Sequence, residues 1–460
     1  MKLLLKGGKI VSGEKVQVAD VLVQGEKILA VGENLTDSDA DIVDVSGKYL
    51  FPGFIDAHTH MALEVCNTIT ADKFDTGTKA ELAGGTTCIV DFATQYEGES
   101  FAQAMDNWHR KADGESSCDY AFHMAISQWD EERWEEIEKL AKEEVSSFKL
   151  YMTYDNRVDD ETMYHILRRL KEVGAIAGVH CENHGIISAR LKEQLVDKGG
   201  REDVSAYPGT RPEEAEAEAV SRLLKIAKCV DTPVIVVHLS TAAAYREVLK
   251  AREEGQTVYI ETCPQYLVMD ESRYSLPSDE ARLYMCAPPL RRKENQKTLW
   301  EGLSEGKIDT VATDHCSFTP EQKEAGASDF AKTPGGMPGA QDRPALLWQF
   351  GVNSKKITPE QMCGYLSENP AKLYHLYPRK GVIAPGSDAD IVVWNPDANW
   401  TIRADQSYSA AGYSPMEGTE INGRAEKVYL RGRLAAENGQ ILEEKLGVYI
   451  PHGTKVMSEA

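Results

Sequence analysis

The 460-residue sequence contains no long apolar run and no excess of basic residues. Its unbroken apolar runs are only a few residues long, whereas a helix that crosses a bilayer needs ~20. Lys and Arg number 51 against 73 Asp and Glu, a formal net charge of −22, and no basic cluster resembles a nucleic-acid footprint. We therefore expect no binding to DNA, RNA or a membrane.

Cysteines are few, and none form a C-x-x-C motif. The nine cysteines are scattered from Cys66 to Cys363, which is typical of reduced thiols rather than of a disulfide framework. The opening residues MKLLLKGGK hold too short an apolar segment for a signal peptide. Together these features predict a cytoplasmic protein.

Both ends of the sequence have the pattern of β structure. Residues 1–52 and 380–445 contain short apolar pieces separated by glycine turns. LLLKGGKIVSG near the start and VYLRGRLAAENG near the end share one order of strand, glycine, basic residue and strand. We therefore expect both termini to build one small β-sandwich domain, followed by a C-terminal tail at 446–460.

The middle of the chain, residues 53–379, alternates β-rich apolar stretches with amphipathic helical patterns. The β-rich stretches lie at 54–60, 86–93, 120–126, 146–154, 175–183, 233–240, 257–265 and 309–318. Helical patterns are clearest at 133–145, 160–174 and 211–228, where Pro212 suits a first turn. Eight strands separated by helices predict an α/β fold, a (β/α)₈ TIM barrel. The irregular stretch 316–345 is expected to be a site loop.

Ionisable residues lie in or at the ends of five of these strands. They are His58, His60, Lys149, His180, His238 and Asp314. The C-terminal ends of barrel strands form the active site in this fold, so these groups would meet on one rim. Two histidines spaced i, i+2 point to the same face of a strand. Imidazole and carboxylate ligands together suit a borderline metal such as Zn²⁺.

Each residue taken alone has an ordinary structural alternative. An H-x-H pair can occur by chance, and a single histidine at a strand end is often only packed there. Asp314, followed by His315, could cap a turn. The coincidence of all of them on one rim favours a metal site.

Lys149 is the unusual member of this set. An ammonium group among residues that hold cations is unfavourable, so its pKa should fall and leave a neutral amine. A neutral amine reacts with CO₂ to give a carbamate, a carboxylate-like group that could bridge two metal ions. The alternative is a lysine at the barrel edge paired with a carboxylate.

Several motifs carry a family resemblance. They are PGFIDAHTH, SSFKLYMTY, GVHCEN, VVHLS, ETCPQYL, APPLR and VATDHCSF. In this order they resemble the hydantoinase/dihydropyrimidinase branch of the cyclic amidohydrolases, from about residue 3 to about residue 450. The resemblance implies a homotetramer or homodimer that hydrolyses a small cyclic ureide. Hydantoins or 5,6-dihydropyrimidines would give N-carbamoyl amino acids.

The resemblance also implies roles for individual residues. It implies two divalent ions, with Zn²⁺ expected in both sites. His58, His60 and Asp314 would bind one ion, His180 and His238 the other, and carboxylated Lys149 would bridge the two. Asp314 would also pass a proton from the attacking water to the leaving nitrogen. The hydroxyl of Tyr154 would help to hold the oxyanion.

Departures from the family pattern bear on the substrate. The dihydroorotase branch has a carboxylate-binding arginine where this chain has Ala62, which disfavours dihydroorotate. MALEVCN at 61–67 is closer to the phenylhydantoinase-like subgroup. The backbones of Ala287 and Gly335 stand where the family binds the amide edge of the ring. Residues that could form the pocket for the ring substituent, or merely pack, are Leu63, Val65, Tyr151 and Val158.

Two alternatives to this function stay open. The ring could be allantoin or another ureide, or the chain could be a non-catalytic scaffolding relative. Scaffolding relatives have lost metal ligands, whereas all six ligand positions are filled here.

Overall fold

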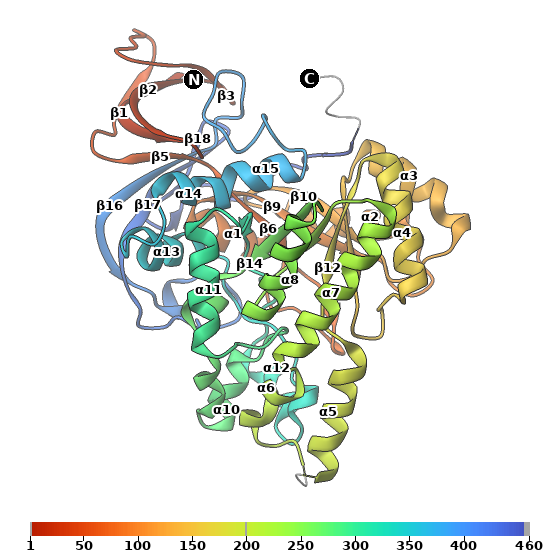
Figure 1. Ribbon diagram of the computed structural model, residues 1–460. Helices are drawn as coiled ribbons and strands as arrows, with labels where there is room; N and C mark the ends of the chain where they lie inside the picture. Colours follow the sequence, from red (N-terminus) through yellow and green to blue (C-terminus); the bar gives the residue numbers. More distant parts are fainter. Residues whose placement is uncertain (1, 198–199, 455–460) are drawn as a thin grey trace.

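The computed structural model describes residues 2–197 and 200–454. At its centre lie eight parallel strands (Figure 1). They are β6 (Phe54–Thr59), β9 (Thr86–Thr94), β10 (Asp119–Ala125), β11 (Ser147–Tyr151), β12 (Ile176–His180), β13 (Val234–Val236), β14 (Val258–Thr262) and β15 (Thr310–Val311). Their order in the sheet follows the sequence, and a parallel bridge between Thr59 and His315 joins its two edges. The predicted TIM barrel is confirmed.

β13 and β15 are shortened most relative to their apolar patterns, and β11, β12 and β14 each cover five of nine expected residues. β13 covers three residues of the expected 233–240, and β15 covers two of the expected 309–318. In both cases a residue beyond the strand has positive φ, 38° at His238 and 52° at Asp314. This conformation ends extended pairing, and an apolar pattern gives no sign of it.

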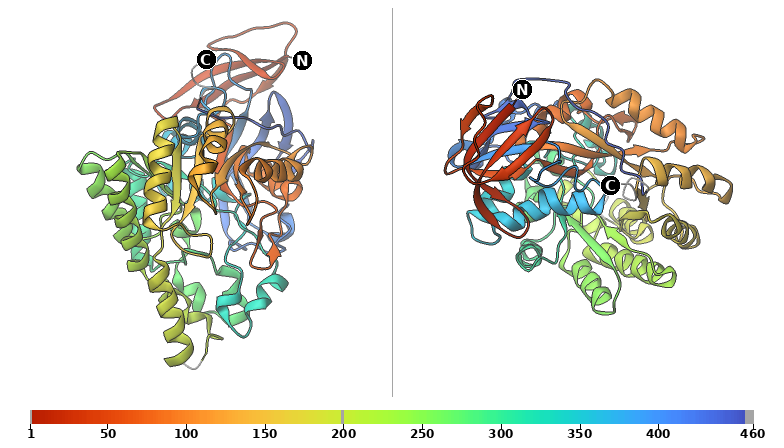
Figure 2. Two further views of the ribbon diagram at one scale, coloured as in Figure 1. Left: turned by 90° about the vertical axis from the view of Figure 1, so that its right-hand side faces the viewer. Right: turned by 90° about the horizontal axis from the view of Figure 1, so that it is seen from above.

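Helices surround the barrel (Figures 1 and 2). The longer ones are α1 (Phe74–Gly84), α2 (Phe101–Ala112), α3 (Trp134–Glu143), α4 (Asp160–Val173), α5 (His184–Asp197), α7 (Glu213–Val230), α8 (Ala242–Glu253) and α11 (Lys293–Ser304). The helices expected at 133–145, 160–174 and 211–228 are confirmed as α3, α4 and α7. The placement of Pro212 is wrong by one position, because it caps α7 in an extended conformation before the first turn.

Helix α4 shows how the sequence fixes such an element. The Asp159 side chain accepts a hydrogen bond from the Thr162 backbone at its start. Gly174 ends it in the left-handed conformation, with φ 72°. The buried side chains recur every three or four residues and are Met163, Ile166, Leu167, Leu170 and Val173. This stripe packs the helix against the barrel.

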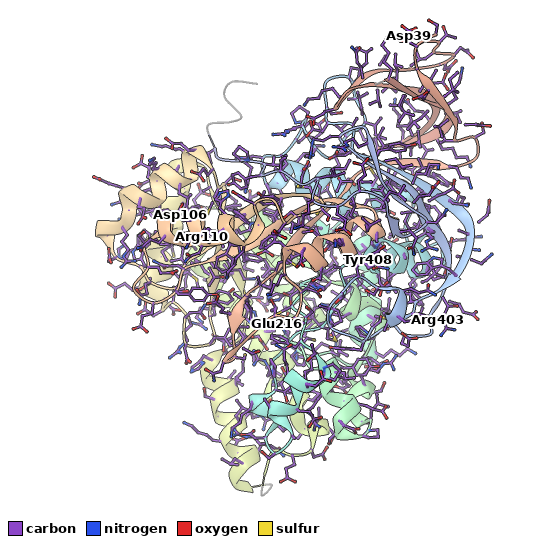
Figure 3. The ribbon with its side chains drawn as sticks, turned by 180° about the vertical axis from the view of Figure 1, so that it is seen from behind. Asp39, Asp106, Arg110, Glu216, Arg403 and Tyr408 are labelled. Carbon is purple, nitrogen blue, oxygen red and sulfur yellow. The ribbon has the colours of Figure 1, made fainter. Side chains whose placement is uncertain are left out.

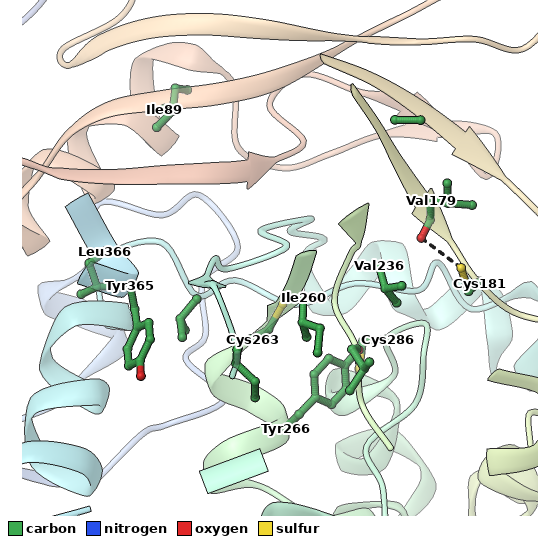
Figure 4. Close-up of a cluster of buried hydrophobic side chains, with 14 of the residues drawn as sticks. Ile89, Val179, Cys181, Val236, Ile260, Cys263, Tyr266, Cys286, Tyr365 and Leu366 are labelled. Atoms are coloured by element: carbon green, nitrogen blue, oxygen red, sulfur yellow. Dashed lines mark hydrogen bonds between the residues drawn. The ribbon is translucent and has the colours of Figure 1, made fainter. Parts of the chain in front are cut away.

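The barrel strands are buried on both faces. Val179, Val236 and Ile260 lie in a large cluster that also includes residues of the surrounding helices (Figure 4). Ile235 and Val237, which alternate with Val236, belong to a separate cluster. Successive side chains of a strand point to opposite faces, so this second cluster fills the barrel interior.

Both termini form one mixed sheet of nine strands. Its strands are β1 (Lys2–Val11), β2 (Val16–Gln24), β3 (Lys27–Gly32), β4 (Asp41–Asp44), β5 (Tyr49–Pro52), β16 (Ile391–Thr401), β17 (Glu420–Leu430), β18 (Arg433–Glu437) and β19 (Gln440–Ile441). β5 pairs with both β1 and β16 and so joins the two ends of the chain. Side chains from both halves share a core separate from that of the barrel. The predicted β domain from both termini is confirmed.

Shorter elements lie mainly after the strands. They are the hairpin β7 (Glu64–Val65) and β8 (Thr68–Ile69), and the helices α6 (Tyr207–Thr210), α9 (Pro264–Val268), α10 (Ser278–Ala281), α12 (Pro320–Lys323), α13 (Arg343–Leu347), α14 (Pro359–Cys363) and α15 (Asn369–Leu373). α5, α6, α10 and α12 gather at the lower end of the barrel in Figure 1, opposite β1 and β2. Only one short helix, α12, and two 3₁₀ turns interrupt the expected loop before α13.

The end of the described chain packs on the barrel. Tyr449 forms a bridge with Tyr120, and the His452 ring contacts the Phe122 carbonyl at 2.9 Å. All nine cysteines are free thiols, as expected. Charged side chains such as Asp39, Asp106 and Arg403 project from the outer surface (Figure 3). Within 2–197 and 200–454, no helix has the length and apolar character needed to span a membrane.

Candidate active site

The end of β6 and the segment after β15 bring three predicted ligands together. The His60 backbone N–H donates to the His315 carbonyl at 2.8 Å, which closes the barrel at this point. One carboxylate oxygen of Asp314 lies 3.2 Å from Nε2 of His58 and 3.2 Å from Nε2 of His60. This arrangement of two imidazoles and a carboxylate can hold one metal ion.

The other two predicted histidines stand beside this group. His180 is the last residue of β12, and its ring centre lies 4.6 Å from that of His238. The His238 ring is in turn 5.4 Å from the His58 ring. Ligand atoms of His58, His238 and Asp314 all lie within 4.8 Å of one another. All four histidines and Asp314 therefore share one small volume.

Lys149 reaches the same volume from β11. Its sheet neighbours are the small residues Ala125 and Gly178, which leave space for the long lysine side chain inside the barrel. The Lys149 amine lies 3.4 Å from Nε2 of His58 and is buried. Loss of solvation by burial lowers its pKa, which favours the neutral amine that carbamate formation requires.

Glu261 of β14 is a buried partner of the histidines that the sequence interpretation missed. One oxygen lies 2.6 Å from Nδ1 of His58 and accepts a hydrogen bond from the His238 backbone at 3.1 Å. Burial raises the pKa of Glu261 and lowers that of His58 well below its usual value. A neutral imidazole is the form that binds metal. A glutamate inside the apolar strand TVYIETCPQ is the signal that could have revealed it.

Comparison with known proteins shows the family of this chain. The amidohydrolase family model matches residues 49–435. A D-hydantoinase of Geobacillus stearothermophilus is 40% identical over 96% of this chain and 94% of its own. A D-phenylhydantoinase of Escherichia coli O9:H4 is 36% identical over 94% of each chain. The crystal structure of a dihydropyrimidinase from Brevibacillus agri superposes with a TM-score of 0.96, at 40% identity and 99% coverage of both chains.

The chain belongs to the amidohydrolase family. Within this family it lies on the expected hydantoinase/dihydropyrimidinase branch. It is therefore an enzyme of the type that hydrolyses cyclic amides. The identities to the D-hydantoinase and the D-phenylhydantoinase are similar, at 40% and 36%.

A second buried network of this amidohydrolase connects His180 to Tyr154. Glu182 lies 2.8 Å from Nε2 of His180 and accepts hydrogen bonds from the Arg211 guanidinium. Arg211 also donates to the Tyr154 hydroxyl at 3.2 Å. The network holds the pKa of the Glu182 carboxyl below its usual value. Neither Glu182 nor Arg211 was identified from the sequence, although Glu182 lies within the motif GVHCEN.

Three residues of the site have backbone conformations that side chains disfavour. Tyr154, His238 and Asp314 have φ values of 73°, 38° and 52°. Each such conformation costs of order 1 kcal/mol or more and persists only where the surrounding structure imposes it. The strands stop short of these residues, and the turn directs each side chain toward the site.

The residues predicted to bind the ring fall into two groups. Ala287 and Gly335 are adjacent, since a β-carbon on Gly335 would lie 4.0 Å from that of Ala287. Val158 lies beside Tyr151, to whose carbonyl its backbone donates at 3.0 Å. Val65 belongs to the β7–β8 hairpin and Leu63 directly precedes it. Val65 is exposed, whereas Leu63 is half-buried.

The donor set at the barrel end fits divalent metal ions. It offers four imidazoles, one carboxylate and a lysine amine with a lowered pKa. Nδ1 of His60 and of His238 are buried, and neither has a hydrogen-bond partner within the described ranges. These donors suit a borderline ion such as Zn²⁺.

Another carboxylate cluster, at the junction of the barrel and the terminal sheet, is neutralised by lysine. Asp119, Asp388 and Asp390 are buried close together. The Lys380 amine lies 2.5, 3.0 and 2.6 Å from their respective oxygens. The amine fills the position that a cation would take, so the cluster is an ion-pair network between the two parts of the fold.

Proposed function

We propose that this amidohydrolase uses two divalent metal ions, with Zn²⁺ as the best match to the donors, to hydrolyse hydantoins or 5,6-dihydropyrimidines to N-carbamoyl amino acids. The observation that carries this proposal is the position of Asp314, 3.2 Å from both His58 and His60 at the barrel end. Relatives named D-hydantoinase and dihydropyrimidinase support the choice of ring.

The metal ligands in this proposal come from five strands or the segments that follow them. His58, His60 and Asp314 would hold one ion, His180 and His238 the other, and a carbamate on Lys149 would join the two. Glu261 would orient His58, and Glu182 would orient His180, through hydrogen bonds to the ring nitrogens that face away from the ions. When bound, the two ions supply water activation and polarisation of the ring carbonyl.

Asp314 would move the proton in this reaction. Water adds to the ring carbonyl carbon, and the Asp314 carboxylate takes the proton that the water loses. The carbon–nitrogen bond of the ring then breaks, and Asp314 returns the proton to the leaving nitrogen. The ring opens to a carboxylate and a ureido group, with no change of oxidation state.

Tyr154 would stabilise the charge that forms on the carbonyl oxygen. Arg211 donates to the Tyr154 hydroxyl oxygen at 3.2 Å, so the hydrogen of that hydroxyl is free to point toward the substrate. A positioned donor of this kind stabilises a tetrahedral oxyanion. The guanidinium makes the hydroxyl a better donor because it withdraws electron density from the oxygen.

Other features follow as part of the same proposal. The backbones of Ala287 and Gly335 would hold the amide edge of the ring, while Leu63, Val65, Tyr151 and Val158 would face its substituent. We also propose that the protein assembles as a homotetramer or homodimer and is located in the cytoplasm. The proposed domain limits are 1–52, 53–379, 380–445 and 446–460.

A spectrophotometric screen with metal analysis tests the function. Purified, metal-replete protein is offered hydantoin, 5-phenylhydantoin, dihydrouracil, allantoin and dihydroorotate. Turnover of one of the first three, with two metal ions per chain, supports the proposal. Turnover of allantoin alone would favour a different ureide, and no turnover of any ring would favour a scaffolding role.

A further inference from the structure

The short helix α12 contacts three segments that surround the proposed substrate site. It has only four residues, yet Gln322 and Lys323 at its end both direct their side chains inward. Gln322 contacts the β7–β8 hairpin, and Lys323 contacts the segments that carry Ala287 and Gly335. In Figure 2, left, the orange hairpin lies close to the teal segment of α12.

Gln322 uses both ends of its amide. Its oxygen accepts a hydrogen bond from the Thr319 backbone at 2.8 Å, as part of a capping box at the start of α12. Its nitrogen donates to the Thr68 hydroxyl at 2.7 Å and to the Ile69 carbonyl at 2.7 Å. One side chain therefore both caps the helix and holds the returning strand of the hairpin.

Lys323 holds two backbone segments together. Its amine donates to the carbonyls of Met285 and Pro334, at 3.0 and 3.1 Å. The side chain is 1% exposed, and no carboxylate within the described ranges pairs with it. The Gly336 backbone donates to the same Met285 carbonyl at 2.9 Å. Lys323 thus ties together the two segments just before the adjacent Ala287 and Gly335.

The burial of this lysine indicates a specific role for its donors. Loss of solvation lowers the Lys323 pKa to about 7. A neutral amine retains two N–H groups, and two carbonyls accept from it here. Burial of a lysine side chain costs free energy. We therefore expect a buried lysine where its hydrogen bonds fix a backbone geometry that apolar packing alone would not fix.

The hairpin and the backbone segments also touch each other. Cys66, in the two-residue turn of the hairpin, lies beside the Gly335 backbone. Cys66 and Asn67 have φ values of 54° and 57°, the conformation that a tight hairpin turn requires. The three segments therefore form one continuous wall, with α12 behind it.

We propose that Gln322 and Lys323 are positioning residues of the substrate site, Gln322 for the wall that faces the ring substituent and Lys323 for the backbone that binds the amide edge. This inference rests on the proposed function. It separates two effects: the Gln322 contact governs the choice among substituted rings, whereas the Lys323 contact governs the affinity for every ring.

Three variants test the Gln322 contact. Gln322→Glu keeps an oxygen for the helix cap but removes both N–H donors and places a carboxylate against the Ile69 carbonyl. We expect the ratio of kcat/KM for 5-phenylhydantoin to that for hydantoin to change by about fivefold or more, as for a lost hydrogen bond. Thr319→Ala, the matched control, weakens the same cap from its other side and should leave the ratio unchanged. Gln322→Ala removes both contacts and should change the ratio and the melting temperature.

Lys323→Met tests the second contact. It keeps the length of the side chain and removes both donors, so KM should rise about tenfold for both rings while kcat changes about threefold or less. Lys323→Gln, which retains an NH₂ group, should give an intermediate KM. Metal content should match the wild type in every variant.

The outcomes distinguish this inference from the function on which it rests. If the metal-replete wild type turns over no ring, the proposed function fails first. If the wild type is active and Gln322→Glu leaves the ratio unchanged, or Lys323→Met lowers kcat with KM unchanged, the inference about α12 is wrong. Should Lys323→Met fail to fold, the KM of Lys323→Gln decides the second part.

Discussion

Nδ1 of His58 lies 2.6 Å from a carboxylate oxygen of Glu261, and both side chains are buried. The contact fixes the proton of the imidazole on Nδ1, so that Nε2 presents a lone pair toward Asp314 and Lys149. The same glutamate oxygen accepts from the His238 backbone. One carboxylate therefore orients residues of both proposed metal sites.

Replacement of Glu261 by Gln should weaken metal binding. The amide keeps the shape of the side chain but loses the charge that supports the Nδ1 proton of His58, and we expect metal affinity to fall about 10- to 100-fold. Metal content after dialysis against graded chelator measures this. Glu301→Gln, at an exposed position of α11, is the control. Unchanged metal retention in the Glu261 variant would show that the contact is only structural.

Replacement of Lys149 by Ala should abolish both activity and metal occupancy, because the bridging carbamate cannot form. Small carboxylic acids such as acetate or propionate should restore part of both, since they can occupy the space of the carbamate. Metal analysis and turnover with increasing acid measure this rescue. Lys297→Ala, which changes an exposed lysine, should show neither loss nor rescue. Full activity with two metals in Lys149→Ala would disprove the bridging role.

Tyr154 and Arg211 should act as one unit in catalysis. Tyr154→Phe removes the proposed oxyanion donor and should lower kcat about 100-fold with metal content retained. Arg211→Lys keeps the positive charge but loses the guanidinium donor to the hydroxyl, and it should lower kcat less. In the double variant the two losses should not add, because the arginine acts through the tyrosine. Fully additive losses would mean that Arg211 serves only to pair with Glu182.

Local sequence patterns were sufficient to predict both the barrel and the positions of the proposed ligands. Strand ends in a parallel barrel meet on one rim, so His58, His180 and His238 could be brought together from their places in the sequence alone. The alternation of apolar stretches was sufficient to find all eight strands. It overestimated β13 and β15, because the turn at His238 and Asp314 depends on tertiary contacts.

The buried partners of the ligands were harder to predict. Glu261 meets His58 across 203 positions of sequence, and Arg211 meets Glu182 across 29. No local period links such pairs, and a charged residue in a strand or loop is read as exposed unless its partner is known. Gln322 and Lys323 were missed for the same reason, since their acceptors lie on other segments.

Lys380 should be essential for the stability of the junction between the barrel and the terminal sheet. Lys380→Met leaves Asp390 buried with no other ion-pair partner in the described ranges, whereas Asp119 keeps Arg431 and Asp388 keeps Lys27 and Arg379. Breaking a buried ion-pair network in this way costs about 3–5 kcal/mol. Denaturant midpoints of the metal-loaded protein measure the change. Lys372→Met, at an exposed ion pair, is the control and should shift the midpoint little. An equally small shift in Lys380→Met would mean that the carboxylates are already protonated and that the lysine does not neutralise them.

Lys323 should make the stability of the protein depend on pH. Its pKa is about 7 in the folded chain, against 10.5 for an ordinary lysine. Between these values the unfolded chain binds a proton that the folded chain does not, so the free energy of unfolding rises with pH, by at most about 1.4 kcal/mol per unit. This contribution is complete above pH 10.5 and lost as the pH falls to about 7. In Lys323→Met it disappears, so the wild type should gain stability relative to the variant between pH 7 and 9.5. Denaturant midpoints of both proteins across this range measure the difference, with Lys297→Met as an exposed control. A constant difference between wild type and Lys323→Met would show that the buried amine keeps its ordinary pKa.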